Sequence, residues 1–266
     1  FPLPRPVSKG SKLAIVAPAG PFDKTAFHSG VAWLEQRYEI AHSPEIFSQE
    51  GYLAGSDQRR LNELQSAIHD PSVDAILCAR GGFGATRLMP GLDSNEIRKA
   101  NKQIVGFSDI SALHATWARA GVRSVHAPMV AALGGASEEI RSRWINALEH
   151  PDQELQWNLE RVDDSKSSAT GILLGGNLAV LAALNGTPFA PPLTDSILFI
   201  EDVGERPYRI DRMLTTLSQS GWFDQLRGII IGAFTEGEPS SDGVSIDEVF
   251  QSHFGRATFP VLKGFS

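Results

Sequence analysis

The first 150 residues alternate short aliphatic runs with longer segments of helical period, and this alternation limits the possible folds more than any other feature of the chain. Strands are expected at 13–17, 73–79 and 103–106, and helices at 25–36 and 57–69. A parallel sheet wrapped by helices produces this order of patterns. The sequence therefore predicts an N-terminal Rossmann-like α/β domain.

Three more helices are expected in this half of the chain: one from about Ala85, one directly after Ser108 and one over 137–149. Ser137 is the predicted cap of the last helix, since serine at this position accepts a bond from the first turn. Glu138 and Glu139 then lie where the helix dipole favours negative charge.

Beyond this half, polar residues without a hydrophobic period predict a linker over 156–170. We expect the first domain to cover 1–155 and a second, smaller, mixed and β-rich domain to cover 171–266. Short aliphatic runs at 197–200 and 228–234 flank a helical pattern at 208–219 in this second domain.

The composition, with 42% hydrophobic and 21% charged residues, is that of a soluble globular protein. A net charge of −7 with scattered Lys and Arg argues against a nucleic-acid partner. No apolar run approaches the roughly 20 residues needed to cross a bilayer, so no membrane partner is expected. The single cysteine, Cys78, lies in a predicted buried strand and excludes an internal disulfide. A cytoplasmic protein fits these observations.

Ser108 is the best candidate nucleophile. It lies in the run Gln103–Ala115, where a short apolar stretch stops at Gly106 and an amphipathic segment follows the serine. This pattern predicts a sharp strand-to-helix turn with the hydroxyl at the positive end of the helix dipole, where a developing oxyanion is stabilised. The alternative is that Ser108 only caps the helix.

The loop Arg80–Gly84, with the sequence Arg-Gly-Gly-Phe-Gly, follows a predicted strand, and its glycine amides can approach a ligand closely. It matches neither the three-glycine spacing of a dinucleotide site nor the Gly-Lys-Ser/Thr ending of a phosphate loop. By itself it predicts a tight turn. Together with Ser108 it becomes a candidate oxyanion hole, with one N–H from Gly82 and one from Asp109.

Glu201 and Asp202 follow four apolar residues in the second domain. An acid therefore stands at the end of a buried strand, where sites of α/β proteins gather. The alternative is a surface ion-pair network between Glu201 and Arg206, Arg209 or Arg212.

None of the seven histidines is an evident partner for Ser108. His114 lies six residues further on and is expected to point away from it, as a packing residue. His126 is more readily a structural histidine than a site residue. The other five lie in polar or helical surroundings: His28, His42, His69, His150 and His253. No metal-ligand spacing occurs.

Six motifs in order along nearly the whole chain resemble the LD-carboxypeptidase family of serine peptidases. They are Arg80–Leu88, Gly106–His114, His126–Met129, Gly175–Leu178, Gly186–Pro188 and Ile200–Met213. The resemblance implies a two-domain hydrolase with a Ser-His-Glu triad, which removes the terminal D-alanine from the tetrapeptide of cytoplasmic muropeptides in cell-wall recycling. On this basis Ser108 is the nucleophile and Glu201 orients the histidine, without metal or organic cofactor, in a homodimer.

In the family the triad histidine lies in a Gly-x-x-Phe-Gly-His segment near the C-terminus, and Lys263–Ser266 resembles the start of that segment. We therefore expect the second domain to continue and the triad histidine to lie beyond Ser266. A carboxypeptidase must also bind the free carboxylate of its substrate, a task that suits arginine. Arg80, Arg87 and Arg206 are the basic residues nearest to the motifs.

Two alternatives remain open at this point. The antibiotic-immunity branch of the same family cleaves microcin-type peptidyl nucleotides, but this compact chain shows no added loop rich in aromatic residues. A muropeptide-binding protein without catalysis is the other alternative, because residues 1–266 do not include the triad histidine.

Overall fold

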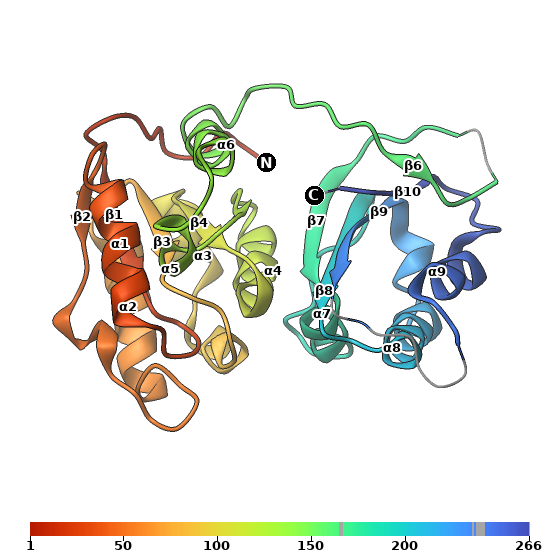
Figure 1. Ribbon diagram of the computed structural model, residues 1–266, viewed down its shortest axis with the longest axis horizontal. Coiled ribbons are helices and arrows are strands. Elements are labelled where there is room, and N and C mark those ends of the chain that lie inside the picture. The colour runs from red at the N-terminus through yellow and green to blue at the C-terminus, as the bar shows by residue number, and fades with distance from the viewer. Residues whose placement is uncertain (165–166, 236, 238–242, 266) are drawn as a thin grey trace. The chain divides into compact units, whose positions relative to one another are not determined.

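The computed structural model describes residues 1–164, 167–235, 237 and 243–265. It divides into two compact units, Phe1–Glu154 and Leu155–Ser266, and Figure 1 labels most of the helices and strands of each. Over these described ranges, every helix is too short or too polar to pass through a bilayer.

The first unit is built on a five-stranded sheet in the order β2-β1-β3-β4-β5, and every pair of neighbouring strands is parallel. Its strands are β1 (Lys12–Val16), β2 (Glu39–Ala41), β3 (Ala75–Cys78), β4 (Gln103–Gly106) and β5 (Val125–His126). The predicted parallel α/β fold is thus confirmed. The ends of β1, β3 and β4 are neighbours, which places the loops after them at one edge of the sheet.

Six α-helices of the first unit connect and flank these strands: α1 (Lys24–Leu34), α2 (Asp57–His69), α3 (Ser94–Ala100), α4 (Ser111–Ala120), α5 (Val130–Leu133) and α6 (Glu138–Glu149). A single-turn 3₁₀ helix, η1 (Pro44–Phe47), precedes α2. The Ser137 side chain accepts a bond from the Ile140 N–H, so the predicted cap of α6 is confirmed.

The helix predicted from Ala85 is wrong. The chain forms two short 3₁₀ turns there, η2 (Ala85–Arg87) and η3 (Met89–Gly91), and α3 begins only at Ser94 with Asp93 as its cap. Pro90 explains the difference, because a proline disfavours helical geometry in the residue before it and removes a backbone donor.

Alternate strand residues form one side of the core of this unit. Leu13, Ile15, Leu77 and Val105 join the buried faces of α1, α5 and α6. Leu13 and Ile15 are two residues apart in β1, so their side chains point to the same face of the sheet. Cys78 is fully buried, and its desolvation raises the pKa of the thiol far above its usual range. The thiol is therefore protonated and acts as a small apolar group.

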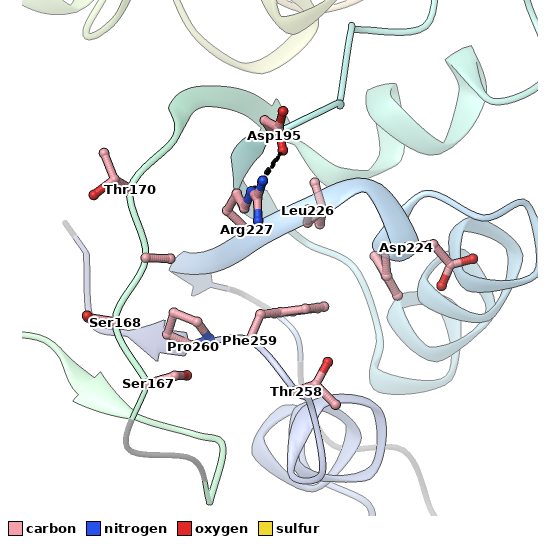
Figure 2. Close-up of a pocket in the computed structure, with 12 residues that line it drawn as sticks. Ser167, Ser168, Thr170, Asp195, Asp224, Leu226, Arg227, Thr258, Phe259 and Pro260 are labelled. Atoms are coloured by element: carbon pink, nitrogen blue, oxygen red, sulfur yellow. Dashed lines mark hydrogen bonds and ion pairs between the residues drawn. The ribbon is translucent and has the colours of Figure 1, made fainter.

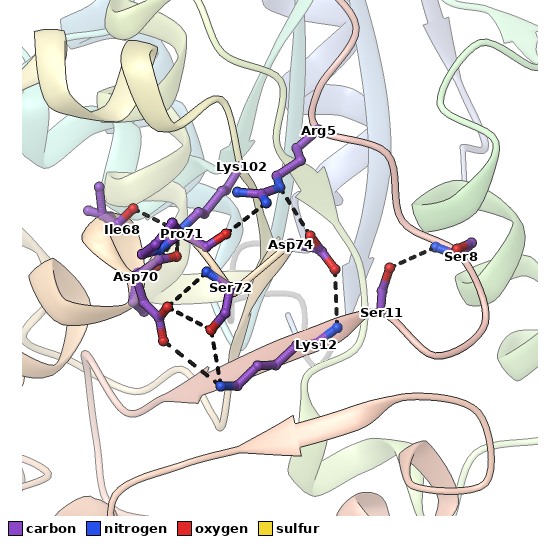
Figure 3. Close-up of polar contacts among 11 residues, drawn as sticks. Arg5, Ser8, Ser11, Lys12, Ile68, Asp70, Pro71, Ser72, Asp74 and Lys102 are labelled. Carbon is purple, nitrogen blue, oxygen red and sulfur yellow. Dashed lines mark hydrogen bonds and ion pairs between the residues drawn. The ribbon is translucent and has the colours of Figure 1, made fainter.

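A buried cation, Lys102, binds the last backbone carbonyls of α2 (Figure 3). The Lys102 ammonium donates to the backbone carbonyls of Ala67 at 2.9 Å, Ile68 at 2.8 Å and Asp70 at 2.5 Å. These carbonyls lack helical partners and carry the negative end of the helix dipole. Burial lowers the pKa of Lys102 to about 8. This contact ties α2 to the start of β4.

The second unit contains a mixed sheet in the order β6-β10-β9-β8-β7, in which only the β6–β10 pair is antiparallel among the described strands. The strands are β6 (Glu160–Arg161), β7 (Ile172–Asn177), β8 (Ser196–Val203), β9 (Leu226–Thr235) and β10 (Val261–Lys263). Helices α7 (Leu178–Leu184), α8 (Pro207–Gln219) and α9 (Ile246–Phe254) pack on it, and η5 (Phe223–Gln225) leads into β9. Leu198, Ile200, Ile229 and Ile231 meet these helices in the core.

The segment predicted as a linker contributes to the second unit. Its β6 pairs with β10, and the buried Asp163 carboxylate accepts a hydrogen bond of 2.7 Å from the Val261 N–H. The sequence did not predict this role, because a two-residue strand and a single buried acid produce no hydrophobic periodicity. Ser165 and Lys166 of this segment lie outside the described residues.

Candidate active site

Ser108 lies directly after β4, where the strand turns into the 3₁₀ turn η4 (Ser108–Ile110) and then α4. Its φ is 61°, in the left-handed region that L-residues other than Asn and Asp rarely adopt. The helix-cap alternative is wrong, because the caps of η4 and α4 are Phe107 and Ile110, without side-chain cap bonds. A strained serine on a strand-to-helix turn is the geometry of an exposed nucleophile.

The glycine loop after β3 lies against this serine. A β-carbon built on Gly81 would come within 3.1 Å of Ser108 Cβ and 3.3 Å of Ser108 Oγ. Only a residue without a side chain leaves this much room beside the hydroxyl. The structure therefore brings together two of the segments that the sequence singled out.

Gly82 has a φ of 112°, and a β-carbon there would contact the backbone of Gly20 at 3.3 Å. The Gly20 N–H in turn donates to the Gly81 carbonyl at 3.0 Å. The loops after β1 and β3 are thus bonded side by side, next to the end of β4. This packing supports Gly82 as a source of the oxyanion N–H, although its donor role stays a prediction.

Asp109 follows the serine and is buried, with 3% of its surface exposed. Its Oδ2 accepts a 2.8 Å hydrogen bond from the Ala85 N–H. Desolvation raises the pKa of Asp109 from its ordinary value, while the Ala85 N–H and the nearby Arg60 oppose that shift. The Asp109 backbone N–H, the predicted second oxyanion donor, lies in the first turn after the nucleophile, where helical N–H groups lack a helical acceptor.

His114 lies on the buried side of α4, and its Nε2 makes a 2.8 Å hydrogen bond to the Gly106 carbonyl. Desolvation lowers its pKa to about 4, so the imidazole is neutral. Its ring centroid is 5.9 Å from that of His126, which ends β5. His114 is therefore a structural histidine, as predicted. His69 and His253 make surface pairs with Glu96 and Asp211.

The arginines predicted to bind a carboxylate differ in their contacts. Arg87 makes an ion pair with Asp57, with its Nε at 2.8 Å and its Nη2 at 2.7 Å from Oδ2 of that residue. Its guanidinium is thus already bound to an anion. Arg80 is exposed and donates to the Pro21 carbonyl at 2.7 Å, a neutral contact that leaves its charge available.

In the second unit, Glu201 lies near the end of β8 with 8% of its surface exposed. Burial and the neighbouring Asp202 raise its pKa to about 7, opposed by a hydrogen bond from Asn177. The predicted acid at the end of a buried strand is confirmed. The surface-network alternative does not fit this burial, and Arg209 pairs with Glu205 instead. Arg206 is exposed at the N-cap of α8.

The sequence did not predict that the Asp202 carboxylate binds the N-terminal end of α7. Its Oδ1 accepts from the Asn177 side chain at 2.9 Å and its Oδ2 from the Ala179 N–H at 2.9 Å. Asp202 thereby holds the first turn of α7 at the end of β8. Its position beside Glu201 and the polar Asn177 after two glycines were the available signals.

A cavity of about 780 Å³ in the second unit contains none of the predicted site residues (Figure 2). It lies beside the start of β9, and the Asp195–Arg227 ion pair of 2.6 Å forms part of its wall. Its location at the amino-terminal ends of β8 and β9 separates it from Glu201, which lies near the carboxyl end of β8.

Comparison with protein families matches residues 13–127 to the LD-carboxypeptidase N-terminal domain and residues 170–266 to the LD-carboxypeptidase C-terminal domain. A putative carboxypeptidase of Streptomyces coelicolor is 38% identical, over 98% of this chain and 86% of its own length. A murein tetrapeptide carboxypeptidase of Pseudomonas aeruginosa is 32% identical, over 94% and 85%.

Among solved structures, muramoyltetrapeptide carboxypeptidase from Oxalobacter formigenes matches with a TM-score of 0.85 and 28% identity, over 96% of this chain and 88% of that one. The microcin C7 self-immunity protein matches with a TM-score of 0.84 over 100% and 90%. Its identity to this chain is 21%, so this second likeness concerns the fold alone.

Proposed function

The chain belongs to the LD-carboxypeptidase family, and we propose that this carboxypeptidase uses Ser108 to remove the terminal D-alanine from muropeptide tetrapeptides. The observation that carries the proposal is the left-handed Ser108 on its strand-to-helix turn, with Gly81 against its hydroxyl. Relatives that are named for murein peptides support the substrate class.

In this mechanism the Ser108 oxygen attacks the carbonyl carbon of the bond to D-alanine and passes its proton to a histidine base. The tetrahedral oxyanion accepts hydrogen bonds from the N–H groups of Gly82 and Asp109. The C–N bond then breaks, the histidine protonates the leaving amine, and water hydrolyses the acyl-serine. Glu201, when ionised, orients the histidine and stabilises its charged form. No step needs a metal or an organic cofactor.

The triad histidine stays a prediction, placed beyond Ser266, which itself lies outside the described residues. The buried, neutral His114 is bonded to a strand carbonyl and does not suit the role of a base. Sequencing the gene past Ser266 tests this point. A Phe-Gly-His continuation supports the enzyme, and a stop codon supports a muropeptide-binding protein without catalysis.

We further propose a cytoplasmic homodimer that has muropeptides as its ligands and no nucleic-acid partner. The net charge of −7 and the scattered basic residues support the last point. Arg80 and Arg206 are the proposed candidates for binding the free carboxylate of the substrate. Both are exposed, whereas Arg87 is paired with Asp57.

The test uses the full-length protein and a fluorophosphonate probe, which reacts with activated serines. We expect labelling at Ser108 and release of D-alanine from a muropeptide tetrapeptide. The Ser108→Ala variant is expected to lose both, whereas Ser111→Ala, three residues further on, keeps labelling at Ser108. Unchanged turnover by Ser108→Ala would overturn the proposal.

Hydrolysis of microcin-type peptidyl nucleotides is the second candidate. The fold shared with the microcin C7 self-immunity protein is the observation that favours it. Assays of both substrates side by side separate the two activities, and the relatives named for murein peptides favour the tetrapeptide.

A further inference from the structure

Helix α2 places a fully buried arginine against two loops of the candidate active site. Arg60 has 0% of its surface exposed, and its Nη1 donates to the Gly84 carbonyl at 2.9 Å. The same nitrogen donates to the Pro18 carbonyl, and Nη2 donates to Asp57. One guanidinium therefore binds the loop after β1 and the glycine loop after β3 at the same time.

The peptide group between Gly84 and Ala85 is held from both sides. Arg60 binds its carbonyl oxygen, and Asp109 binds its N–H through the 2.8 Å bond to Oδ2. Both side chains are buried and of opposite charge, so each strengthens the hydrogen bond that the other makes through the peptide dipole. Asp109 directly follows Ser108. The glycine loop is thus coupled to the nucleophile turn through a single peptide group.

The position of Gly84 leaves no room for a side chain. Its φ is 122°, and a β-carbon there would lie 2.7 Å from Arg60 Nη1 and 2.6 Å from a Leu53 methyl group. The arginine therefore packs directly onto the loop backbone. A buried charge is costly unless it is bonded, and all of these bonds go to the loops and to Asp57.

We propose that Arg60 is a positioning residue, which with Asp109 fixes the Gly81–Gly84 loop in the conformation that points the Gly82 N–H at the reacting carbonyl. This inference rests on the proposed function of Ser108 and deepens it. Oxyanion donors work only when they are held in place before the reaction, and a misplacement of about 1 Å can cost roughly 100-fold in rate.

The test compares Arg60→Met and Arg60→Lys with Lys102→Met. Lys102 is the matched control, because it is also a buried cation bound to backbone carbonyls, but it lies at the opposite end of β4 from Ser108. Thermal unfolding, the kcat and KM of D-alanine release, and the rate of fluorophosphonate labelling are measured for each full-length variant.

We expect Arg60→Met to lower kcat and the labelling rate about 10- to 100-fold, with KM within about threefold. Arg60→Lys should recover part of kcat, since an ammonium can still donate to the Gly84 carbonyl. Lys102→Met should lower the Tm to a similar degree and keep kcat within about twofold. Equal losses of kcat in Arg60→Met and Lys102→Met at equal Tm would overturn the proposal.

Hydrogen–deuterium exchange of the amides of residues 82–85 provides a readout that does not depend on activity. Arg60→Met should speed exchange there at least tenfold, and Lys102→Met should leave it unchanged. Full activity of Ser108→Ala would refute the proposed nucleophile while the exchange result could still stand. Unchanged exchange in Arg60→Met would refute the positioning role even if Ser108 is the nucleophile.

Discussion

The backbone of Gly81 lies directly against the side chain of Ser108, so that a β-carbon on the glycine would come within 3.3 Å of the serine hydroxyl oxygen. The two residues belong to loops that follow the neighbouring parallel strands β3 and β4. A side chain added at position 81 would therefore reduce the space beside the Ser108 hydroxyl, and its effect on the reactivity of the serine can be measured.

Gly81→Ala is expected to slow fluorophosphonate labelling and D-alanine release at least tenfold, because the added methyl group fills the space through which a carbonyl must approach. Met129 Cε, 3.4 Å from the added carbon, leaves little room for relaxation. Gly135→Ala is the control, since its β-carbon meets nothing within 4 Å. Labelling at the wild-type rate in Gly81→Ala would contradict the proposed site geometry.

Ser108→Gly is expected to be more stable than Ser108→Ala by about 1 kcal/mol, because glycine adopts a φ of 61° without the steric cost that alanine bears. Urea unfolding measures this difference. At Ser111, where φ is −53°, the order should reverse and the alanine variant should be the more stable. Equal stability of the two Ser108 variants would mean that the turn is not strained.

Glu201→Gln is expected to stabilise the protein at pH 8 and not at pH 4.5. The folded-state pKa of about 7 lies above the ordinary value of 4.5, so the folded state holds this proton more tightly than the unfolded state. Stability from this group is therefore present below pH 4.5 and is lost as the pH rises to 7. The gain of the variant at pH 8 should reach about 3 kcal/mol.

Calorimetry at both pH values measures this difference. Glu154→Gln, which removes an exposed carboxylate from the other unit, is the control. The same stability difference for Glu201→Gln at pH 4.5 and pH 8 would contradict the raised pKa.

Asp163→Ala is expected to destabilise the second unit by about 1–3 kcal/mol, because the Val261 N–H would lose its buried acceptor. Calorimetry of the full chain measures the loss. The neighbouring Asp164 is exposed, and Asp164→Ala should change stability by less than about 0.5 kcal/mol. Equal effects of both changes would show that the buried bond contributes nothing.

Much of the fold followed from local pattern. The helix α2 begins and ends where its period predicts, and the strands β3, β4 and β8 are the aliphatic runs that the sequence marked. Two predictions from the sequence were wrong, for different reasons. The helix expected after Ala85 does not form because Pro90 interrupts it. The strand β6 was not predicted because it is only two residues long and lies in a polar segment without hydrophobic periodicity.

Some residues of the candidate site could be predicted from local pattern and others could not. Ser108, the glycine loop and Glu201 were evident because each stands where an apolar run ends. Arg60 gave no signal, since in the sequence it is one of two adjacent arginines near the start of a polar helix. Its importance depends on bonds to residues that are 42 and 24 positions away.

Residue types and their spacing along the chain were enough to predict the α/β character of the first unit, the family and the chemical type of the proposed nucleophile. The left-handed backbone of Ser108, the contact of Gly81 with its side chain and the bond from Arg60 to the Gly84 carbonyl became evident only in the folded chain. Contacts between distant segments depend on how strands pair and helices pack, and no local pattern records them.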